Sequence, residues 1–311
     1  MRSQPVKAYL AERDRHKTLG AKEARQVTCA MCQRVLGDCK MKESQPVVES
    51  QVPMREVYKS LLLKTYPVWS SVMPGFYYPY KLEAGWVYLN IKESRMMLQR
   101  ALGCYEESKH QAFKQFLRSG ATFVDVGCNK GDFTLLASRL VGPQGRVLAF
   151  EPHPENCRWI RKSIAKNEYQ NITLHEMALS DANGTAQLHI GEKSGFHTLL
   201  AGKPQREKGI IEVQTRRLDD LLAQVGFHRP IDAIKIDVEG ADMHVLRGAR
   251  ETIARSPGIV VFLDVHPHLG VNPAEVCDFL RGLGLDLFTE EPPFNVAIED
   301  HSSLDALIAH A

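Results

Sequence analysis

One stretch, FVDVGCNKGDF at residues 123–133, constrains the fold more than any other part of the chain. An apolar run is broken by Asp125, and Gly127 and Gly131 follow, four positions apart. Glycines in such a turn adopt backbone conformations that other residues avoid, and they let a ligand approach the main chain. The stretch therefore predicts a buried strand, a ligand-binding turn and a helix that begins at Asp132.

Strand and helix patterns alternate along the chain around this turn. Predicted strands cover residues 122–127, 146–151, 171–179, 184–190, 210–218, 231–240 and 258–266, and predicted helices cover roughly 106–119, 132–140, 154–166, 242–255 and 273–283. Such alternation is typical of βαβ units joined in a parallel sheet with helices on both faces. We therefore expect an α/β domain over residues 101–311.

The glycine spacing bears on the kind of ligand. Dinucleotide-binding turns use G-x-G-x-x-G because a pyrophosphate must approach the helix N-terminus closely. In this chain Cys128 and Asn129 follow Gly127, and Gly131 is the next glycine. The turn therefore suits a nucleoside that carries no pyrophosphate, and the spacing counts against an NAD-dependent dehydrogenase.

Two carboxylates near the turn indicate which nucleoside it binds. Glu151 ends the next predicted strand, 20 residues after Gly131, where an acid can accept hydrogen bonds from both ribose hydroxyls. Asp125 supplies negative charge suited to a cationic amino-acid group. Taken singly, each residue has a plain structural explanation, as a strand-end acid or an acceptor for turn amides. In combination with the turn they predict S-adenosyl-L-methionine as the cofactor.

The motifs GCYEES (103–108), FVDVGCNKGDFTLLAS, VLAFEPHPENCRWIRKSIAKN, ALSDANGTAQLHI and IKIDVEGADMHVLRGA stand in an order that resembles the FkbM family of S-adenosylmethionine-dependent methyltransferases. The resemblance covers about residues 100–290. It implies a Rossmann-like class I methyltransferase fold, whose seven-stranded, mostly parallel sheet has a reversed last strand. Residues 294–298 are the candidate for that strand.

The resemblance also implies an activity and further site residues. Family members mostly methylate hydroxyl oxygens of sugars, polyketides or other small metabolites, so the expected partner is a small hydroxylated acceptor. The EPHPEN and ALSD motifs add Pro152, Ala178 and Leu179 to the expected cofactor contacts. Cys128 stands where the family usually has a smaller residue, and the first 90 residues match no part of the family pattern.

Candidate catalytic residues are those at the carboxyl ends of the central strands, where open α/β sheets bind ligands. Asp237 and Glu239 follow one such strand, and His266 follows the next, two residues after Asp264. Asp237 or His266 is the candidate base for a hydroxyl acceptor, with Asp264 as a candidate to orient the imidazole, and Glu239 is a candidate substrate contact. The plain alternatives are that Asp237 caps the following helix and that His266 is a packed strand-end residue.

The polar loop at residues 191–200 offers Ser194 and His197 as further substrate contacts, although a solvated surface loop would have the same composition. The sequence EPPF at 291–294 resembles a motif with which amino-methylating enzymes hold a nitrogen acceptor. It follows the wrong strand for that role, so a turn is the better interpretation.

The segments before the domain divide into two by composition. Residues 1–50 are basic and contain Cys29, Cys32 and Cys39, a spacing that lacks a clear fourth ligand, so we expect free thiols and no metal. Residues 51–100 are rich in aromatic side chains, which we expect to dock this segment on the following domain; a lid over the substrate is the alternative. The aromatic residues are Tyr66, Trp69, Phe76, Tyr77, Tyr78, Tyr80 and Trp86.

Composition limits the remaining classes of protein. The chain has a net charge of +2, seven cysteines and no long apolar run, so we expect a cytoplasmic protein that has no membrane segment and is unlikely to bind nucleic acid. Two rival functions remain: an RNA-modifying methyltransferase that uses residues 1–50, and a non-catalytic protein that binds the cofactor. Nothing in the sequence sets the oligomeric state.

Overall fold

The computed structural model describes residues 54–192, 195–200, 207–299 and 304–310. The predictions for residues 1–50, including the three cysteines, and for Ser194 concern positions outside the described residues. No helix within the described residues is long and apolar enough to cross a membrane.

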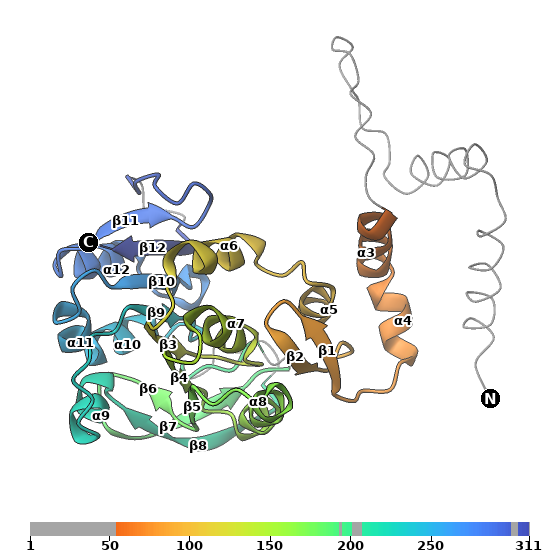
Figure 1. Cartoon of the computed structure of the whole chain (residues 1–311). Helices are drawn as coiled ribbons and strands as arrows, with labels where there is room; N and C mark the ends of the chain where they lie inside the picture. Colours follow the sequence, from red (N-terminus) through yellow and green to blue (C-terminus); the bar gives the residue numbers. More distant parts are fainter. Residues whose placement is uncertain (1–53, 193–194, 201–206, 300–303, 311) are drawn as a thin grey trace, which may run out of the picture. The chain divides into compact units, whose positions relative to one another are not determined.

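The element order follows the predicted alternation (Figure 1). The helices are α3 (Met54–Lys64), α4 (Tyr66–Val72), α5 (Arg95–Leu102), α6 (Glu107–Phe116), α7 (Asp132–Val141), α8 (Pro154–Asn167), α9 (Leu218–Gln224), α10 (Asp242–Gly248), α11 (Arg250–Ala254), α12 (Pro273–Arg281) and the 3₁₀ turn η1 (Pro267–Leu269). The strands are β1 (Tyr78–Leu82), β2 (Gly85–Leu89), β3 (Thr122–Val126), β4 (Arg146–Phe150), β5 (Ile172–His175), β6 (Ala178–Leu179), β7 (Gly184–Ile190), β8 (Gly209–Arg216), β9 (Ala233–Ile236), β10 (Val260–Asp264), β11 (Asp286–Thr289) and β12 (Ala306–His310).

The central sheet has seven strands in the order β11-β12-β10-β9-β3-β4-β5. Strands β10, β9, β3, β4 and β5 pair in parallel, and β12 runs antiparallel to both of its neighbours, β10 and β11. This arrangement confirms the predicted class I methyltransferase fold with a reversed last strand. The predicted position of that strand was wrong: it is β12, while residues 294–298 contribute only an isolated bridge, Phe288 to Ala297.

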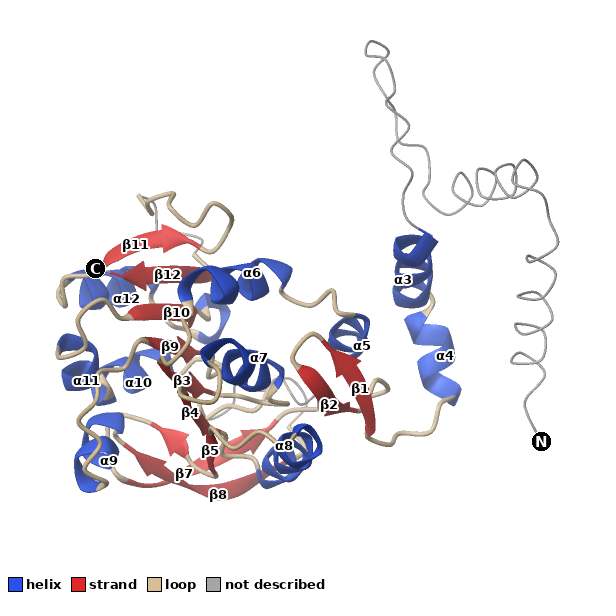
Figure 2. Cartoon of the chain, viewed as in Figure 1, coloured by secondary structure: helices blue, strands red, loops and turns tan. Residues whose placement is uncertain are grey.

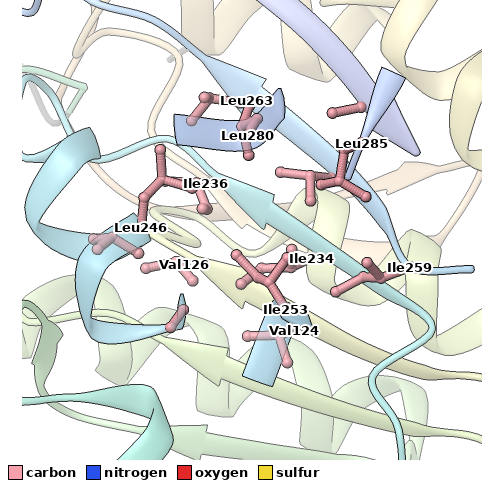
Figure 3. Packing of buried hydrophobic residues seen from close by; sticks show 14 of the residues in the cluster. Val124, Val126, Ile234, Ile236, Leu246, Ile253, Ile259, Leu263, Leu280 and Leu285 are labelled. Carbon is pink, nitrogen blue, oxygen red and sulfur yellow. The ribbon is translucent and has the colours of Figure 1, made fainter. Parts of the chain in front are cut away.

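Alternation along the central strands builds a separate core on each face of the sheet. On one face, Val124, Ile234 and Leu263 pack with residues of α9, α10, α11 and α12 (Figure 3). On the other face, Phe123 and Phe262 pack with residues of α5, α6, α7 and β2. Successive strand residues point to opposite faces, so strands buried on both sides are continuously apolar, as the sequence of β10, VVFLD, illustrates.

A second sheet of three strands, β6-β8-β7, is separate from the central one (Figure 2). Its strands β7 and β8 pair antiparallel over seven residues, and the short β6 pairs in parallel with β8. The predicted single strand at 171–179 is therefore two strands: β5 belongs to the central sheet and β6 to the small one. The chain changes sheets at Glu176 and Met177, between the two strands.

The hairpin β1-β2 precedes the central sheet and contacts α8. The backbone N–H of Trp86 donates to the side chain of Asn167 (2.7 Å), and that of Tyr88 donates to Ser163 (3.1 Å). The ring of Tyr77 stacks on Trp159 with centroids 4.1 Å apart. These contacts place part of the aromatic segment against the helix that follows β4.

Candidate functional site

The glycine turn after β3 brings the ends of three central strands together. The N–H groups of Gly127 and Cys128 both donate to the carbonyl of Phe150, the last residue of β4 (3.0 and 3.1 Å). Gly127 has φ +77°, and a Cβ added there would lie 1.9 Å from the carbonyl oxygen of Asp237, just after β9. Only glycine fits this close approach.

A pocket of about 750 Å³, counting the open space at its mouth, lies at these strand ends. The sequence-predicted residues that line it are Gly127, Asn129, Glu151, Pro152, Ala178, Leu179, His197, Asp237 and Glu239. The structure therefore brings most of the predicted cofactor contacts and three of the predicted acceptor contacts to one cavity.

Glu151 is held by three hydrogen bonds beside the turn. Its Oε2 accepts from the N–H of Asn129 (2.8 Å), and its Oε1 accepts from the N–H of His153 (3.0 Å) and the side chain of Asn156 (3.2 Å). Burial raises the pKa of Glu151 to about 7, although these hydrogen bonds and Lys130 act in the opposite direction. Each carboxylate oxygen has two lone pairs, so Oε2 can accept from a ribose hydroxyl as well.

Asp125 and Gly131 lie away from the pocket lining. Asp125 is fully buried, where its Oδ2 accepts from the hydroxyl of Thr134 (2.5 Å) and its Oδ1 lies 3.8 Å from the ammonium of Lys235. Gly131 packs against Ile160 at the start of α7. Both residues therefore lie behind the turn, and neither lines the pocket.

Asp237, Glu239 and His266 form an ionisable cluster at one side of the pocket. The imidazole Nε2 of His266 lies 3.6 Å from Asp237 and 3.9 Å from Glu239. His266 does not line the pocket itself, since it lies behind the two carboxylates and is 8% exposed. The cluster joins the ends of β9 and β10, as expected for neighbouring parallel strands.

The charges within this cluster shift each pKa. Burial lowers the pKa of His266, but the hydrogen bond and charge of Asp242, with Asp237 and Glu239, raise it to about 9. Burial raises the pKa of Asp237, but Lys235, Lys109 and His266 outweigh it and lower it to about 2. Burial and the charge of Asp237 raise the pKa of Glu239 to about 8. Shifts of this kind are typical of functional sites.

Asp242 orients His266, and the sequence did not predict this role. Its carboxylate oxygens both lie 3.3 Å from Nδ1 of His266, and Asp242 is completely buried at the start of α10. The expectation that Asp264 orients the imidazole was wrong. Asp264 instead accepts two hydrogen bonds from the buried ammonium of Lys109 on α6, at 2.7 and 2.6 Å.

The same cluster has the ligand types of a metal site. One ligand atom each from Asp237, Glu239 and His266 lies within 4.8 Å of the others. Against this use, the ammonium of Lys235 lies 3.3 Å from Asp237 and already compensates its charge. We therefore keep the prediction that the site works without a metal.

The loop after β7 contributes His197 to the pocket. The His197 ring lies 4.5 Å from that of His153, and its Nδ1 accepts from the N–H of Gly191 (3.2 Å). Burial, with the nearby charge of His153, lowers the pKa of His197 to about 3. The hydroxyl of Thr198 donates to the carbonyl of Glu239 (2.6 Å) and so ties this loop to the cluster.

The α5 segment supplies pocket residues that the sequence reasoning missed. Met96, Arg100 and Tyr105 all line the cavity. Helix α5 is fixed by Ser94, whose side chain caps its N-terminus, and by Gly103, which has φ +66° at its C-terminus. Of these three residues, only Tyr105 lies in a motif, GCYEES, on which the resemblance to the FkbM family rests.

Three curated relatives of the chain have methyltransferase names. It is 31% identical over 147 residues to the 2-O-methyltransferase NoeI of Sinorhizobium fredii, covering 43% of this chain and 59% of the relative. It is 30% identical to Methyltransferase 1 of Beauveria bassiana (40% and 57% covered), and 26% identical to the hexuronic acid methyltransferase AglP of Haloferax volcanii (50% and 59% covered). The matched regions thus span less than two thirds of each relative.

The family model described as the methyltransferase FkbM domain matches residues 125–287. This range begins in β3, includes the glycine turn, Glu151 and the cluster around His266, and ends in β11. Because the match covers more than half of the 311 residues, the chain belongs to the FkbM methyltransferase domain family.

Proposed function

We propose that this protein is an S-adenosylmethionine-dependent methyltransferase that methylates a hydroxyl oxygen of a small acceptor, and that this acceptor is a sugar. The observation that carries the proposal is that one pocket joins Glu151, at the glycine turn, to Asp237 and Glu239. The name of one relative, a 2-O-methyltransferase, favours a hydroxyl oxygen as the acceptor atom, and the name of another, a hexuronic acid methyltransferase, favours a sugar.

The cofactor half of the proposal rests on Glu151 and the turn. The Glu151 carboxylate would accept hydrogen bonds from the ribose hydroxyls, and Asn129, Pro152, Ala178 and Leu179 would form the surrounding walls. When bound, S-adenosylmethionine supplies an activated methyl group on a sulfonium. Since the leaving group needs no further activation, the protein has to align the acceptor, exclude water and accept a proton.

The acceptor half of the proposal rests on the cluster around His266. Asp237 and Glu239 line the pocket, so they are placed to hydrogen-bond an acceptor hydroxyl. The proton of that hydroxyl passes through the Asp237 carboxylate to the neutral imidazole of His266, whose Nε2 lies 3.6 Å from Asp237. Asp242 holds Nδ1 and stabilises the imidazolium that results. A base of this kind contributes about 10²- to 10⁴-fold to the rate.

The assay for this proposal is transfer of labelled methyl from S-adenosylmethionine to a panel of hydroxylated sugars and uronates. We expect product from the wild-type protein and a loss of about 100-fold or more with His266→Gln. His244→Gln is the matched control, since His244 is an exposed histidine that also pairs with an aspartate, Asp181.

Three results would separate the rival functions. If Asp237→Asn and His266→Gln both bind the cofactor normally and both remain active, the assignment of the base is wrong. Cofactor binding without transfer to any acceptor would favour the non-catalytic alternative. Transfer to RNA, with salt-sensitive RNA affinity, would favour an RNA-modifying enzyme.

A further inference from the structure

Arg100 is a buried cation with unfilled hydrogen-bonding capacity at the pocket. It is 5% exposed and lines the cavity from α5. Its Nε and Nη1 are buried and have no hydrogen-bond partner among the described residues. Leaving charged donors unsatisfied in a protein interior is costly, so such groups usually bind something.

Neighbouring side chains contact the guanidinium of Arg100 but leave two of its nitrogens without a hydrogen-bond partner. Nε lies 3.4 Å from an oxygen of Asp132, and the guanidinium carbon lies 4.3 Å from the centre of the Tyr105 ring. Asp132 balances the charge of Arg100 and Tyr105 supports one face of its plane. Tyr105 also hydrogen-bonds the guanidinium, but Nε and Nη1 remain without a hydrogen-bond partner. These two donors are therefore available to an anion, and a carboxylate can accept from them.

The position of Arg100 beside the glycine turn indicates which part of a bound ligand would reach it. Its partner Asp132 directly follows Gly131 in the glycine turn, and Gly127 and Asn129 of that turn line the same cavity. Glu151, the proposed ribose contact, lies at the end of the next strand, β4. A ligand whose ribose meets Glu151 therefore has room to extend toward Arg100 along the turn.

We propose that Arg100 binds the carboxylate of the amino-acid end of S-adenosylmethionine. The inference rests on the proposed function, because it takes the nucleoside at Glu151 as its starting point. The same chemistry would suit the carboxylate of a uronate acceptor, so the experiment has to distinguish the two sources.

The experiment is calorimetric titration with S-adenosylmethionine and with decarboxylated S-adenosylmethionine, which lacks only the carboxylate. We expect the wild-type protein to prefer the complete cofactor by about 10- to 100-fold. In Arg100→Gln that preference should fall to about twofold or less, because only the affinity for the complete cofactor declines. Arg161→Gln, which removes an exposed arginine paired with Glu176, should keep the wild-type preference.

Arg100→Gln leaves the buried carboxylate of Asp132 without its cation, which can destabilise the fold. A second variant therefore serves as a control for this effect. The double variant Arg100→Gln/Asp132→Asn removes both charges of the pair and should show the same lost preference. The wild-type measurement tests the inference without any substitution: equal affinity for the two ligands would overturn it.

The remaining outcomes separate this inference from the proposed function. If the wild-type protein binds neither ligand, the proposed function fails and the inference fails with it. If both ligands bind equally and sodium glucuronate raises the melting temperature of the wild type but not of Arg100→Gln, the carboxylate belongs to the acceptor and the cofactor assignment is overturned.

Discussion

At the scale of single residues, Glu151 is the most specific element of the proposed cofactor site. It combines burial, hydrogen bonds from both the glycine turn and the start of α8, and a place on the pocket wall. Glu151→Gln replaces one acceptor oxygen by an NH₂ group, which faces donors already in place. We expect the dissociation constant for S-adenosylmethionine to rise by about 10- to 100-fold in calorimetry.

The control for this prediction is Glu155→Gln, four residues on, where the side chain is exposed at the start of α8. Its affinity for the cofactor should match that of the wild type. Unchanged affinity in Glu151→Gln would show that the ribose is held elsewhere.

A second residue-scale prediction concerns Asp242 and the pH dependence of the reaction. The proposed base is neutral His266, so kcat/KM should rise with pH toward the His266 pKa of about 9. Asp242 is one of the groups that raise that pKa, so Asp242→Asn must lower it. We expect the midpoint of the pH profile to move down by about one unit, and the plateau to fall about tenfold because the ring is no longer held.

Asp181→Asn is the matched control, since Asp181 pairs with the exposed His244 away from the pocket. Its pH profile should coincide with that of the wild type. A profile that stays in place in Asp242→Asn, or moves to higher pH, would contradict the assignment of His266 as the base.

The sequence predicted residues whose roles are set locally and missed those set by distant partners. Gly127 and Glu151 were found because a turn and a strand end can be recognised within a few neighbours. Asp242 was missed because it reaches His266 from 24 positions away, at the start of another helix. Arg100 was missed because only the packing of α5 beside the turn gives an isolated arginine a place in the pocket.

At the scale of elements, the unit β3-turn-α7 contains a glycine whose position leaves no space for a side chain. Gly127 and Gly120 both have positive φ, +77° and +85°, but only Gly127 has a backbone atom where a Cβ would go. Alanine at either position costs about 1–2 kcal/mol through left-handed strain. Gly127→Ala must also separate the turn from β9, so it should lose more stability than Gly120→Ala and lose cofactor binding.

Thermal unfolding and calorimetric titration of the two variants test this difference. Gly120→Ala should bind the cofactor like the wild type, because nothing lies within 4 Å of the added methyl. Equal loss of stability in the two variants would mean that the approach of the turn to Asp237 is not tight.

Elements whose partners are far away in the chain were the ones predicted incorrectly. An apolar run, Ala306–His310, inserts between β10 and β11 as the reversed strand β12, and no local signal distinguishes this from residues 294–298. Similarly, β6 leaves the central sheet because Ala178 pairs with Thr215 of β8. Alternation predicts that a segment is a strand, but not which strand lies beside it.

At the scale of the whole molecule, two half-buried carboxylates have raised pKa values: Glu239 lines the pocket, and Glu290 lies beside Lys109. Burial and the charge of Asp237 raise the pKa of Glu239 to about 8. Burial, together with Asp264, outweighs Lys109 and raises the pKa of Glu290 to about 8. For both groups the ordinary value is 4.5, so the folded protein keeps protons that the unfolded chain releases, and stability falls as the pH rises toward 8.

His266 acts in the same direction over a neighbouring pH range. Its folded pKa of about 9 lies above its ordinary value of 6.5, so the stability it contributes is fully present below 6.5 and is lost as the pH rises through 9. His197 has a lowered pKa of about 3, so its opposite effect is complete by pH 6.5. Above that pH, the stability contributed by the shifts of Glu239, Glu290 and His266 decreases as the pH rises.

We therefore expect the free energy of unfolding, measured by urea denaturation, to decrease steadily between about pH 6.5 and pH 9. Glu290→Gln should make this decrease shallower, because one of the groups that releases a proton on unfolding is removed. The exposed Glu275, which pairs with Arg247, provides the control, and Glu275→Gln should keep the wild-type slope. A stability that is constant or rises over this range would mean that the buried carboxylates are compensated by positive charge beyond Lys109 and Lys235.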